Sequence, residues 1–225
     1  MSLILHINTS DTLAGVSLGS NGQVLAYCEN DLQKEHASFL QPAIKRLLKA
    51  QRLTLHEVDA VAVVNGPGSY TGLRVGLASA KGICYALNKP LITINALKLM
   101  SKAAVMSMNK ELQPLPLLCP MIDARRMEVF TAIYNSDLQT ILPAQALVLT
   151  DESFVNILLQ HEILFFGNGS AKYRTLTKHH NAHFAAEYVT TEALATLSED
   201  AFSINDFANV AYSEPLYLKE FYNGQ

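Results

Sequence analysis

Hydrophobic residues open the chain as three short runs separated by polar turns. The runs span residues 3–7, 13–18 and 24–28, and they are joined by Asn8–Asp11 and by Asn21-Gly22. Short apolar runs joined by Asn-Gly and similar turns are typical of β-hairpins. The pattern therefore predicts three strands connected as hairpins.

The next part of the chain alternates between helical and strand patterns. Apolar residues recur at helical spacing between residues 36 and 51, where Pro42 indicates either a helix start near Gln41 or a kink. Continuous apolar runs, typical of buried strands, then alternate with helical stretches. We predict strands at 58–64 and 91–94 and helices at 71–87 and 96–107. Together with the hairpins, this order indicates a mixed α/β sheet.

A polar, proline-containing stretch at residues 109–116 is the best candidate for a domain boundary. Beyond it the pattern of elements partly restarts. The expected elements are a strand-turn-strand hairpin at 117–134, a short helix at 152–160, a buried strand at 163–166, and one or two helices within 191–212. We therefore expect two related α/β lobes, residues 1–108 and a smaller lobe of residues 109–225.

Composition indicates a folded chain that needs no metal or disulfide for stability. Of the 225 residues 49% are hydrophobic and 16% charged, and the three cysteines are widely spaced among apolar neighbours, which suits reduced core residues. No run approaches the roughly 18 apolar residues of a membrane span, and the start has no signal-peptide pattern. We expect a cytoplasmic protein with no membrane partner.

Charge is distributed unevenly along the chain. Residues 1–105 carry ten Lys/Arg and six Asp/Glu, whereas residues 106–225 carry seven and fourteen. Part of the basic excess is Lys45, Lys49 and Arg52, whose spacing places them on one face of a helix. That face is either an ordinary solvated surface or a docking surface for an acidic partner or RNA phosphates.

The most specific segment is the glycine-rich sequence GPGSYTGLR at residues 66–74, between a buried strand and a helix. Gly66 and Gly68 permit unusual backbone angles, and Ser69 or Thr71 can cap the helix, whose first N–H groups can face an anion. The Lys-Ser/Thr pair of a P-loop is missing. The segment is therefore either a nucleotide or anion site formed by these four residues or a tight structural turn.

This nonapeptide and five other segments occur in the order found in the TsaB family, also called YeaZ. The others are LILHINTS at 3–10, HASFLQP at 36–42, DARRMEVF at 123–130, GNG at 167–169 and EPLYLK at 214–219. The match spans nearly the whole chain, and several ordered matches are far more specific than one. The sequence is therefore identified as a member of that family.

The resemblance implies an actin-like, sugar-kinase-like ATPase fold of two ribonuclease-H-like lobes, the second of them reduced. It implies a non-catalytic subunit that binds and activates the catalytic paralogue TsaD, together with the ATPase TsaE, in forming threonylcarbamoyladenosine in tRNA. The resemblance also implies that this chain meets tRNA only indirectly, through the other subunits of the complex. No cofactor is expected to be held tightly by this chain, and ATP or ADP with Mg²⁺ is placed at a shared interface of the complex.

Two departures from active relatives favour a non-catalytic role. TsaD binds metal through two histidines spaced i, i+4 on a helix, whereas here His36 is followed by Leu40, and one imidazole cannot build such a site. Active members of the fold carry an aspartate on the first hairpin for magnesium, whereas this chain has Asn8, a poorer ligand. We expect no metal site, no catalytic residue, and no ATP hydrolysis by the chain alone.

Two further groups of side chains fit catalysis poorly. Asp123 and Glu128 should point to opposite faces of their strands, so a surface hairpin is expected rather than an acid–base pair. The histidines at 179, 180 and 183 lie in a polar segment that offers no evident third or fourth metal ligand. Neither group predicts a reaction.

A row of small residues on the helix predicted at 71–87 suggests where a partner docks. Gly72, Gly76 and Ala80 share one side of that helix, which lets another backbone approach closely. The row packs either on the protein's own sheet or on another subunit. The resemblance favours a subunit seam shared with the helix at 36–51, so His36 and Leu40 join the interface candidates. The same patch can pair with itself as a homodimer.

The leading hypothesis from the sequence is thus a scaffold subunit that is not itself an enzyme. The alternative is an independent ATP-binding or ATP-hydrolysing enzyme of the actin-like fold, because fold similarity does not settle function. ATP hydrolysis by the purified chain separates the two hypotheses.

Overall fold

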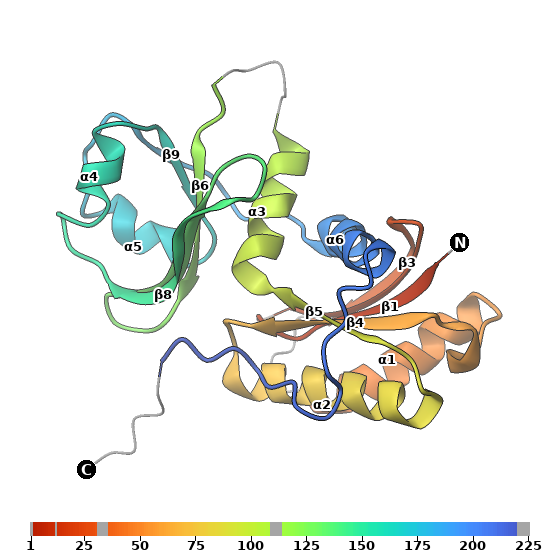
Figure 1. The fold of residues 1–225 in the computed structure, drawn as a ribbon. Coiled ribbons are helices and arrows are strands. Elements are labelled where there is room, and N and C mark those ends of the chain that lie inside the picture. The colour runs from red at the N-terminus through yellow and green to blue at the C-terminus, as the bar shows by residue number, and fades with distance from the viewer. Residues whose placement is uncertain (1, 12, 31–35, 109–113, 220–225) are drawn as a thin grey trace, which may run out of the picture. The chain divides into compact units, whose positions relative to one another are not determined.

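The computed structural model describes residues 2–11, 13–30, 36–108 and 114–219, which form two compact units (Figure 1). The first unit consists of the chain up to Leu99 together with Thr190–Leu216. The second consists of Met100–Val189 and the segment that begins at Tyr217. Each unit contains one five-stranded sheet.

The first sheet has β1 (Leu3–Asn8) at its centre, in the strand order β3-β2-β1-β4-β5. On one side the antiparallel strands β2 (Ala14–Ser20) and β3 (Gln23–Asn30) continue from β1 as hairpins. On the other side lie β4 (Ala60–Gly66) and β5 (Leu91–Asn95), both parallel to β1. The hairpins and the two buried strands predicted from the sequence are confirmed.

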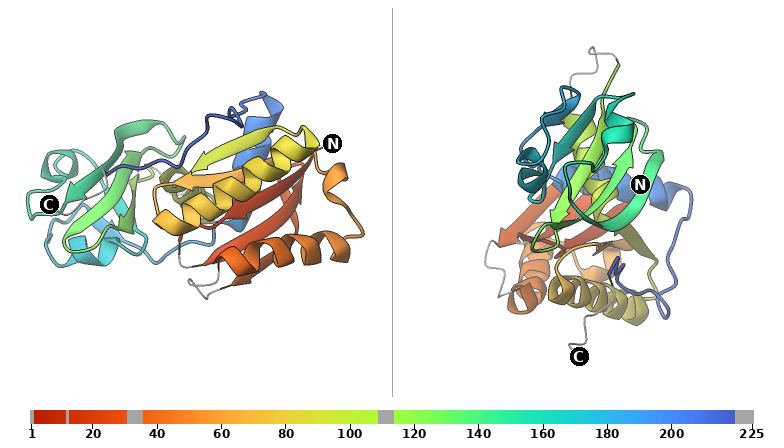
Figure 2. Two further views of the ribbon diagram at one scale, coloured as in Figure 1. Left: turned by 90° about the horizontal axis from the view of Figure 1, so that it is seen from below. Right: turned by 90° about the vertical axis from the view of Figure 1, so that its left-hand side faces the viewer.

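Helices cover both faces of the first sheet (Figures 1 and 2). α1 (His36–Ala50) and α2 (Tyr70–Leu87) lie side by side on one face, and α6 (Thr191–Ser203) covers the other. α1 begins six residues before Pro42, so a start near Gln41 was wrong. A short 3-10 helix, Leu55–Glu57, precedes β4.

The second sheet repeats this arrangement around β6 (Leu117–Asp123), in the order β10-β9-β6-β7-β8. β7 (Glu128–Tyr134) and β8 (Thr140–Val148) follow as antiparallel strands on one side. β9 (Ile163–Phe166) and β10 (Ala182–Phe184) are parallel to β6 on the other. The repeat confirms the expected fold of two related lobes.

The second unit is reduced in its helices rather than in its sheet. α4 (Val155–Leu158) and α5 (Ser170–Arg174) are four and five residues long. An aromatic group of Phe154, Phe165 and Tyr173 fills the core between them and the sheet. β8, β10 and α5 were not predicted from the sequence, and the helix expected at 152–160 is shorter than expected.

The division into units differs from the boundary expected at residue 109. It falls inside α3 (Ala96–Ser107), between Leu99 and Met100, and residues 190–216 return to the first unit. The polar stretch at 109–116 predicted the boundary because linkers between domains are exposed and polar. Such a stretch does not show which of the two sheets a later helix covers. None of the helices formed by the described residues has the length and apolar character of a membrane span.

Candidate functional site

The glycine-rich turn between β4 and α2 is closed by the protein's own backbone. The N–H of Ser69 donates to the carbonyl of Ser10 at 2.7 Å, and the Ser69 hydroxyl caps α2 by accepting from the N–H of Gly72 at 3.4 Å. A Cβ atom on Gly68 would lie 2.2 Å from the same Ser10 carbonyl oxygen. Only glycine fits there, because the loop after β1 lies directly against the turn.

The C-terminal segment closes the other side of this turn. The N–H of Leu216 donates to the carbonyl of Asn65 at 2.7 Å, and a Cβ on Gly66 would lie 2.7 Å from the Leu216 carbonyl oxygen. Gly66 also has a φ of +123°, which other residues rarely adopt. The turn is therefore faced by two carbonyl oxygens, from Ser10 and Leu216, which repel phosphate oxygens. This geometry favours a structural turn over an anion site, and Thr71 is exposed on the first turn of α2.

Asn8, which the sequence analysis compared with a magnesium-binding aspartate, is held in the same loop. Its side-chain oxygen accepts hydrogen bonds from the N–H of Ser10 at 3.2 Å and from the hydroxyl of Ser10 at 2.7 Å. The amide oxygen that would have to approach a magnesium ion is thus already used to shape the loop.

The row of small residues on α2 faces the protein's own sheet, so a subunit seam along this row was wrong. The hydroxyl of Thr9 donates to the carbonyl of Gly72 at 2.7 Å, and a Cβ on Gly76 would lie 2.3 Å from the Thr9 hydroxyl oxygen. Ala80 and Leu40 are both fully buried in the core of the first unit. A partner cannot reach these four residues in the folded chain. The side chain of His36 lies outside the described residues.

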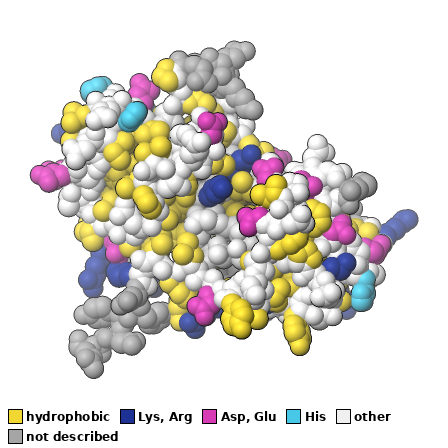
Figure 3. All heavy atoms as spheres, in the orientation of Figure 1, with side chains coloured by type: hydrophobic (Ala, Val, Ile, Leu, Met, Phe, Trp, Pro, Cys, Tyr) yellow, Lys and Arg dark blue, Asp and Glu magenta, His cyan; other side chains and the backbone are white. Residues whose placement is uncertain are grey.

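The opposite, outward side of α2 carries a different row. Arg74, Ala78, Gly82 and Tyr85 are exposed, and nothing lies within 4 Å of a Cβ built on Gly82. Tyr85 is 85% exposed. Figure 3 shows exposed hydrophobic side chains along the lower edge of the first unit, where α2 and the segment before Leu216 overlap in the view. This side offers the open, partly apolar surface that the inward side lacks.

The neighbouring helix α1 contributes an exposed basic side. Lys45, Arg46 and Lys49 are exposed on it, and Arg46 donates to the Sγ of Cys28. Arg52 is not part of this face, because α1 ends at Ala50 and Arg52 adopts a left-handed conformation beyond it. The expected basic face therefore consists of helix residues alone.

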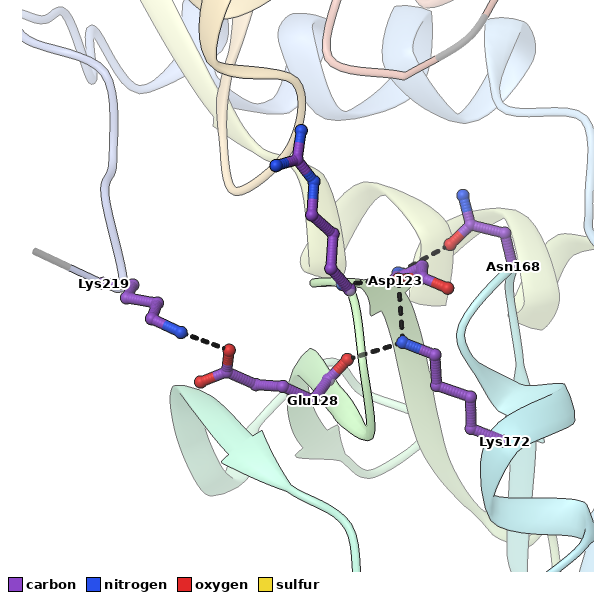
Figure 4. A network of polar contacts seen from close by, with 6 residues as sticks. Asp123, Glu128, Asn168, Lys172 and Lys219 are labelled. Atoms are coloured by element: carbon purple, nitrogen blue, oxygen red, sulfur yellow. Dashed lines mark hydrogen bonds and ion pairs between the residues drawn. The ribbon is translucent and has the colours of Figure 1, made fainter. Parts of the chain in front are cut away.

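In the second unit, a polar network surrounds the turn between β6 and β7 (Figure 4). Lys172 on α5 contacts the Asp123 carboxylate at 2.7 Å and the carbonyl of Glu128 at 2.9 Å. Lys219 contacts the Glu128 carboxylate at 2.5 Å. The side-chain oxygen of Asn168 accepts from the N–H of Asp123 at 2.8 Å. Each carboxylate is thus engaged by a different lysine.

The contact with Lys172 makes Asp123 unsuited to be the acid of an acid–base pair. Desolvation raises the pKa of Asp123, but the hydrogen bonds from Lys172 and from the N–H of Arg125, with the Lys172 charge, outweigh it and lower the pKa below the usual 3.8. A carboxylate so stabilised is a poor proton donor near neutral pH.

The histidine-rich segment does not gather into a metal site. His179 and His180 stack with ring centroids 4.7 Å apart, and His183 in β10 lies 3.6 Å from a Glu162 oxygen. Across the described ranges, no group of three or more His, Cys, Asp or Glu residues has the geometry to hold a metal ion.

His6 is a buried titratable residue that no sequence pattern singles out. It lies under α6, with its Nδ1 3.1 Å from the Ser17 hydroxyl and with no partner for its Nε2 among the described residues. Desolvation lowers its pKa from 6.5 to about 4, although the hydrogen bond to Ser17 acts in the opposite direction. His6 is therefore neutral at physiological pH.

Comparison with known proteins identifies the family. Residues 30–220 match the family model described as TsaD: tRNA N6-adenosine threonylcarbamoyltransferase. The tRNA threonylcarbamoyladenosine biosynthesis protein TsaB of Haemophilus influenzae is 28% identical, over 96% of this chain and 93% of that protein. The TsaB protein of Bacillus subtilis is also 28% identical, over 77% of this chain and 74% of that protein. The chain belongs to the TsaD family, in its TsaB branch.

The structure is similar to that of YeaZ from Pseudomonas aeruginosa, with a TM-score of 0.78. The two chains are 23% identical, over 97% of this chain and 100% of that one, and the similarity shows that they share a fold.

The segments that carry the TsaB resemblance meet one another within each unit. In the first unit, the end of the 3–10 segment and Leu216 both close on the glycine-rich turn. In the second, Asn168 and Lys219 both reach the 123–130 hairpin. Sequence order alone did not show these contacts, which join residues from 45 positions apart, as in Asn168 and Asp123, to more than 150 apart, as in Leu216 and Asn65.

Proposed function

We propose that this chain is a non-catalytic subunit that binds and activates TsaD, together with TsaE, during formation of threonylcarbamoyladenosine in tRNA. The observation that carries this proposal is the position of Leu40, one turn after His36 in α1 and fully buried in an apolar core. A metal site made of two side chains one helical turn apart requires a ligand at that position. Leucine offers none, so the chain lacks the donor pair on which TsaD chemistry depends.

The names of the relatives support the assignment to this pathway, because the matching TsaB proteins are named for threonylcarbamoyladenosine biosynthesis. The engagement of Asn8 with Ser10 supports a non-catalytic role, since the amide oxygen is used within the loop. Both observations favour a scaffold over an independent ATPase.

TsaD docks, in this proposal, on the outward sides of α1 and α2. These helices lie side by side on one face of the first sheet and expose small residues, a tyrosine and a row of cations. Small residues allow a partner helix to approach closely, and exposed tyrosines are frequent centres of binding energy. In the absence of TsaD, the same surface can form a homodimer.

Reconstitution tests the proposed function. The purified chain is mixed with TsaD and TsaE of its own organism, and the mass of the complex, the modification of tRNA and the hydrolysis of ATP are measured. We expect modification to require both this chain and TsaD, while the chain alone modifies no tRNA. Hydrolysis of ATP by the chain alone at about 1 per second or faster would instead identify an independent enzyme.

A further inference from the structure

The turn between β6 and β7 presents two adjacent arginines at the tip of a hairpin. Arg125 and Arg126 are both exposed, and their φ angles of +70° and +48° place both in the left-handed region. Two successive residues with side chains in that region cost roughly 1–2 kcal/mol each. The fold therefore holds this pair in place through other contacts.

Those contacts make the turn rigid. The Asp123 carboxylate accepts from the N–H of Arg125 at 2.6 Å, and the N–H of Glu128 donates to the Arg125 carbonyl at 3.1 Å. The N–H of Ala124 donates to the Glu128 carbonyl at 3.1 Å. Gly169 packs beneath the hairpin, where a Cβ would lie 3.1 Å from the nitrogen of Asp123. The arginine backbones are thus fixed before any partner binds.

The carboxylates beside the turn do not neutralise the arginines. Asp123 contacts Lys172, and Glu128 contacts Lys219. The group formed by these four residues and the two arginines carries four cations and two anions, so its net charge is two positive. Residues 106–225 contain seven Lys/Arg and fourteen Asp/Glu. Four of the seven cations therefore gather at one hairpin in an otherwise acidic half of the chain.

We propose that the β6–β7 turn, with Arg125 and Arg126 at its tip, contacts the phosphate backbone of the tRNA on which the complex acts. This inference rests on the proposed function for the presence of tRNA. Guanidinium groups bind phosphate through paired, charge-assisted hydrogen bonds. Contacts to a nucleic-acid backbone need only exposed cations on a fixed support, which is the arrangement at this turn.

Other anionic partners fit the turn less well. A protein interface has an apolar centre, whereas Met127, 39% exposed, is the one large hydrophobic residue among those at 124–127. A free nucleotide binds in an enclosed pocket, whereas both arginines lie on an exposed tip. A polyanion that passes over the surface matches this shape and charge.

The test measures tRNA binding by the reconstituted complex of this chain with TsaD and TsaE across a range of salt concentrations. Replacing both arginines, Arg125→Gln with Arg126→Gln, should weaken binding roughly tenfold at low salt and reduce the slope of log affinity against log salt by about 1.5. The control pair, Lys98→Gln with Lys178→Gln, removes two exposed charges elsewhere and should change neither quantity. Arg125→Lys with Arg126→Lys keeps the charge and should keep the salt slope.

The outcomes separate this inference from the proposed function. If the wild-type complex does not assemble, the proposed function fails. If it assembles and the double glutamine variant, with an unchanged melting temperature, binds tRNA as tightly as wild type, the turn is no RNA contact. Loss of assembly with TsaD or TsaE in that variant, or loss of ATP binding with normal tRNA binding, would equally overturn the inference in favour of a protein or nucleotide contact.

Discussion

A Cβ atom built on Gly76 would lie 2.3 Å from the hydroxyl oxygen of Thr9, whose hydrogen bond to the Gly72 carbonyl ties β1 to α2. The side chain of Thr9 therefore occupies the space beside α2 into which any larger residue would have to fit. This contact decides which side of α2 faces the core.

Gly76→Leu should destabilise the fold rather than act on a partner surface. Overpacking of this kind typically costs about 1–3 kcal/mol, and displacement of Thr9 also breaks its hydrogen bond to Gly72. For a chain of this size the melting temperature should fall by roughly 2–4 °C for each kcal/mol. Thermal unfolding checks this, and an unchanged melting temperature would show that the helix can shift away from Thr9.

Gly82→Leu is the matched variant on the outward side of the same helix. Because nothing lies within 4 Å of a Cβ there, leucine should leave the melting temperature unchanged or raise it through its better helix propensity, worth up to about 1 kcal/mol. Affinity for TsaD should fall roughly five- to a hundredfold if a helix packs against this side. Titration calorimetry on a well-folded sample of the variant measures this affinity. If the variant binds TsaD as tightly as the wild type does, this part of α2 is not in the proposed docking surface.

Stability should depend on pH through His6. Its pKa is about 4 in the folded chain, against the ordinary histidine value of 6.5, so the unfolded chain binds a proton more readily. The contribution of neutral His6 to the free energy of unfolding is fully present above pH 6.5. It is lost as the pH falls towards 4, and the total loss is about 3 kcal/mol. Denaturant unfolding between pH 7 and 4 should show this loss in wild type and a flatter profile in His6→Leu. Equal slopes in the two proteins would assign the loss to other groups.

Asn8→Asp should preserve the loop after β1 without creating an ATPase. A carboxylate can accept both hydrogen bonds from Ser10, so the melting temperature should change by no more than about 2 °C. Asn8→Ala removes both bonds and should cost about 1 kcal/mol. Phosphate release by the isolated Asn8→Asp chain should stay at background, and a large gain would reveal a nearly intact nucleotide site.

The sequence was sufficient for the elements with strong patterns and insufficient for contacts between distant residues. The apolar runs of β1 and β4 and the helical spacing in α1 predicted these elements because burial of their side chains requires that spacing. β8 was missed because Pro143 interrupts its pattern, and β10 because it has three residues and pairs with β9 alone.

The candidate site was predicted in part, for a related reason. Helical spacing places Gly72, Gly76 and Ala80 on one side of a helix but does not say which side faces the sheet. That depends on Thr9, more than sixty residues earlier in the chain. The lysines that contact Asp123 and Glu128 lie 49 and 91 residues further along the sequence. Such pairs follow from the fold rather than from any local pattern.

The division of the chain into units also fixes an order of completion during synthesis. The first sheet is finished at β5, but α6, which covers its second face, emerges from the ribosome about a hundred residues later. Until then Ile4 and His6 lack their cover, while the second unit already has all five of its strands. The first part of the chain to be made is therefore the last to reach its native core, and a nascent chain that stops before Thr191 leaves that face of the sheet open to other apolar surfaces.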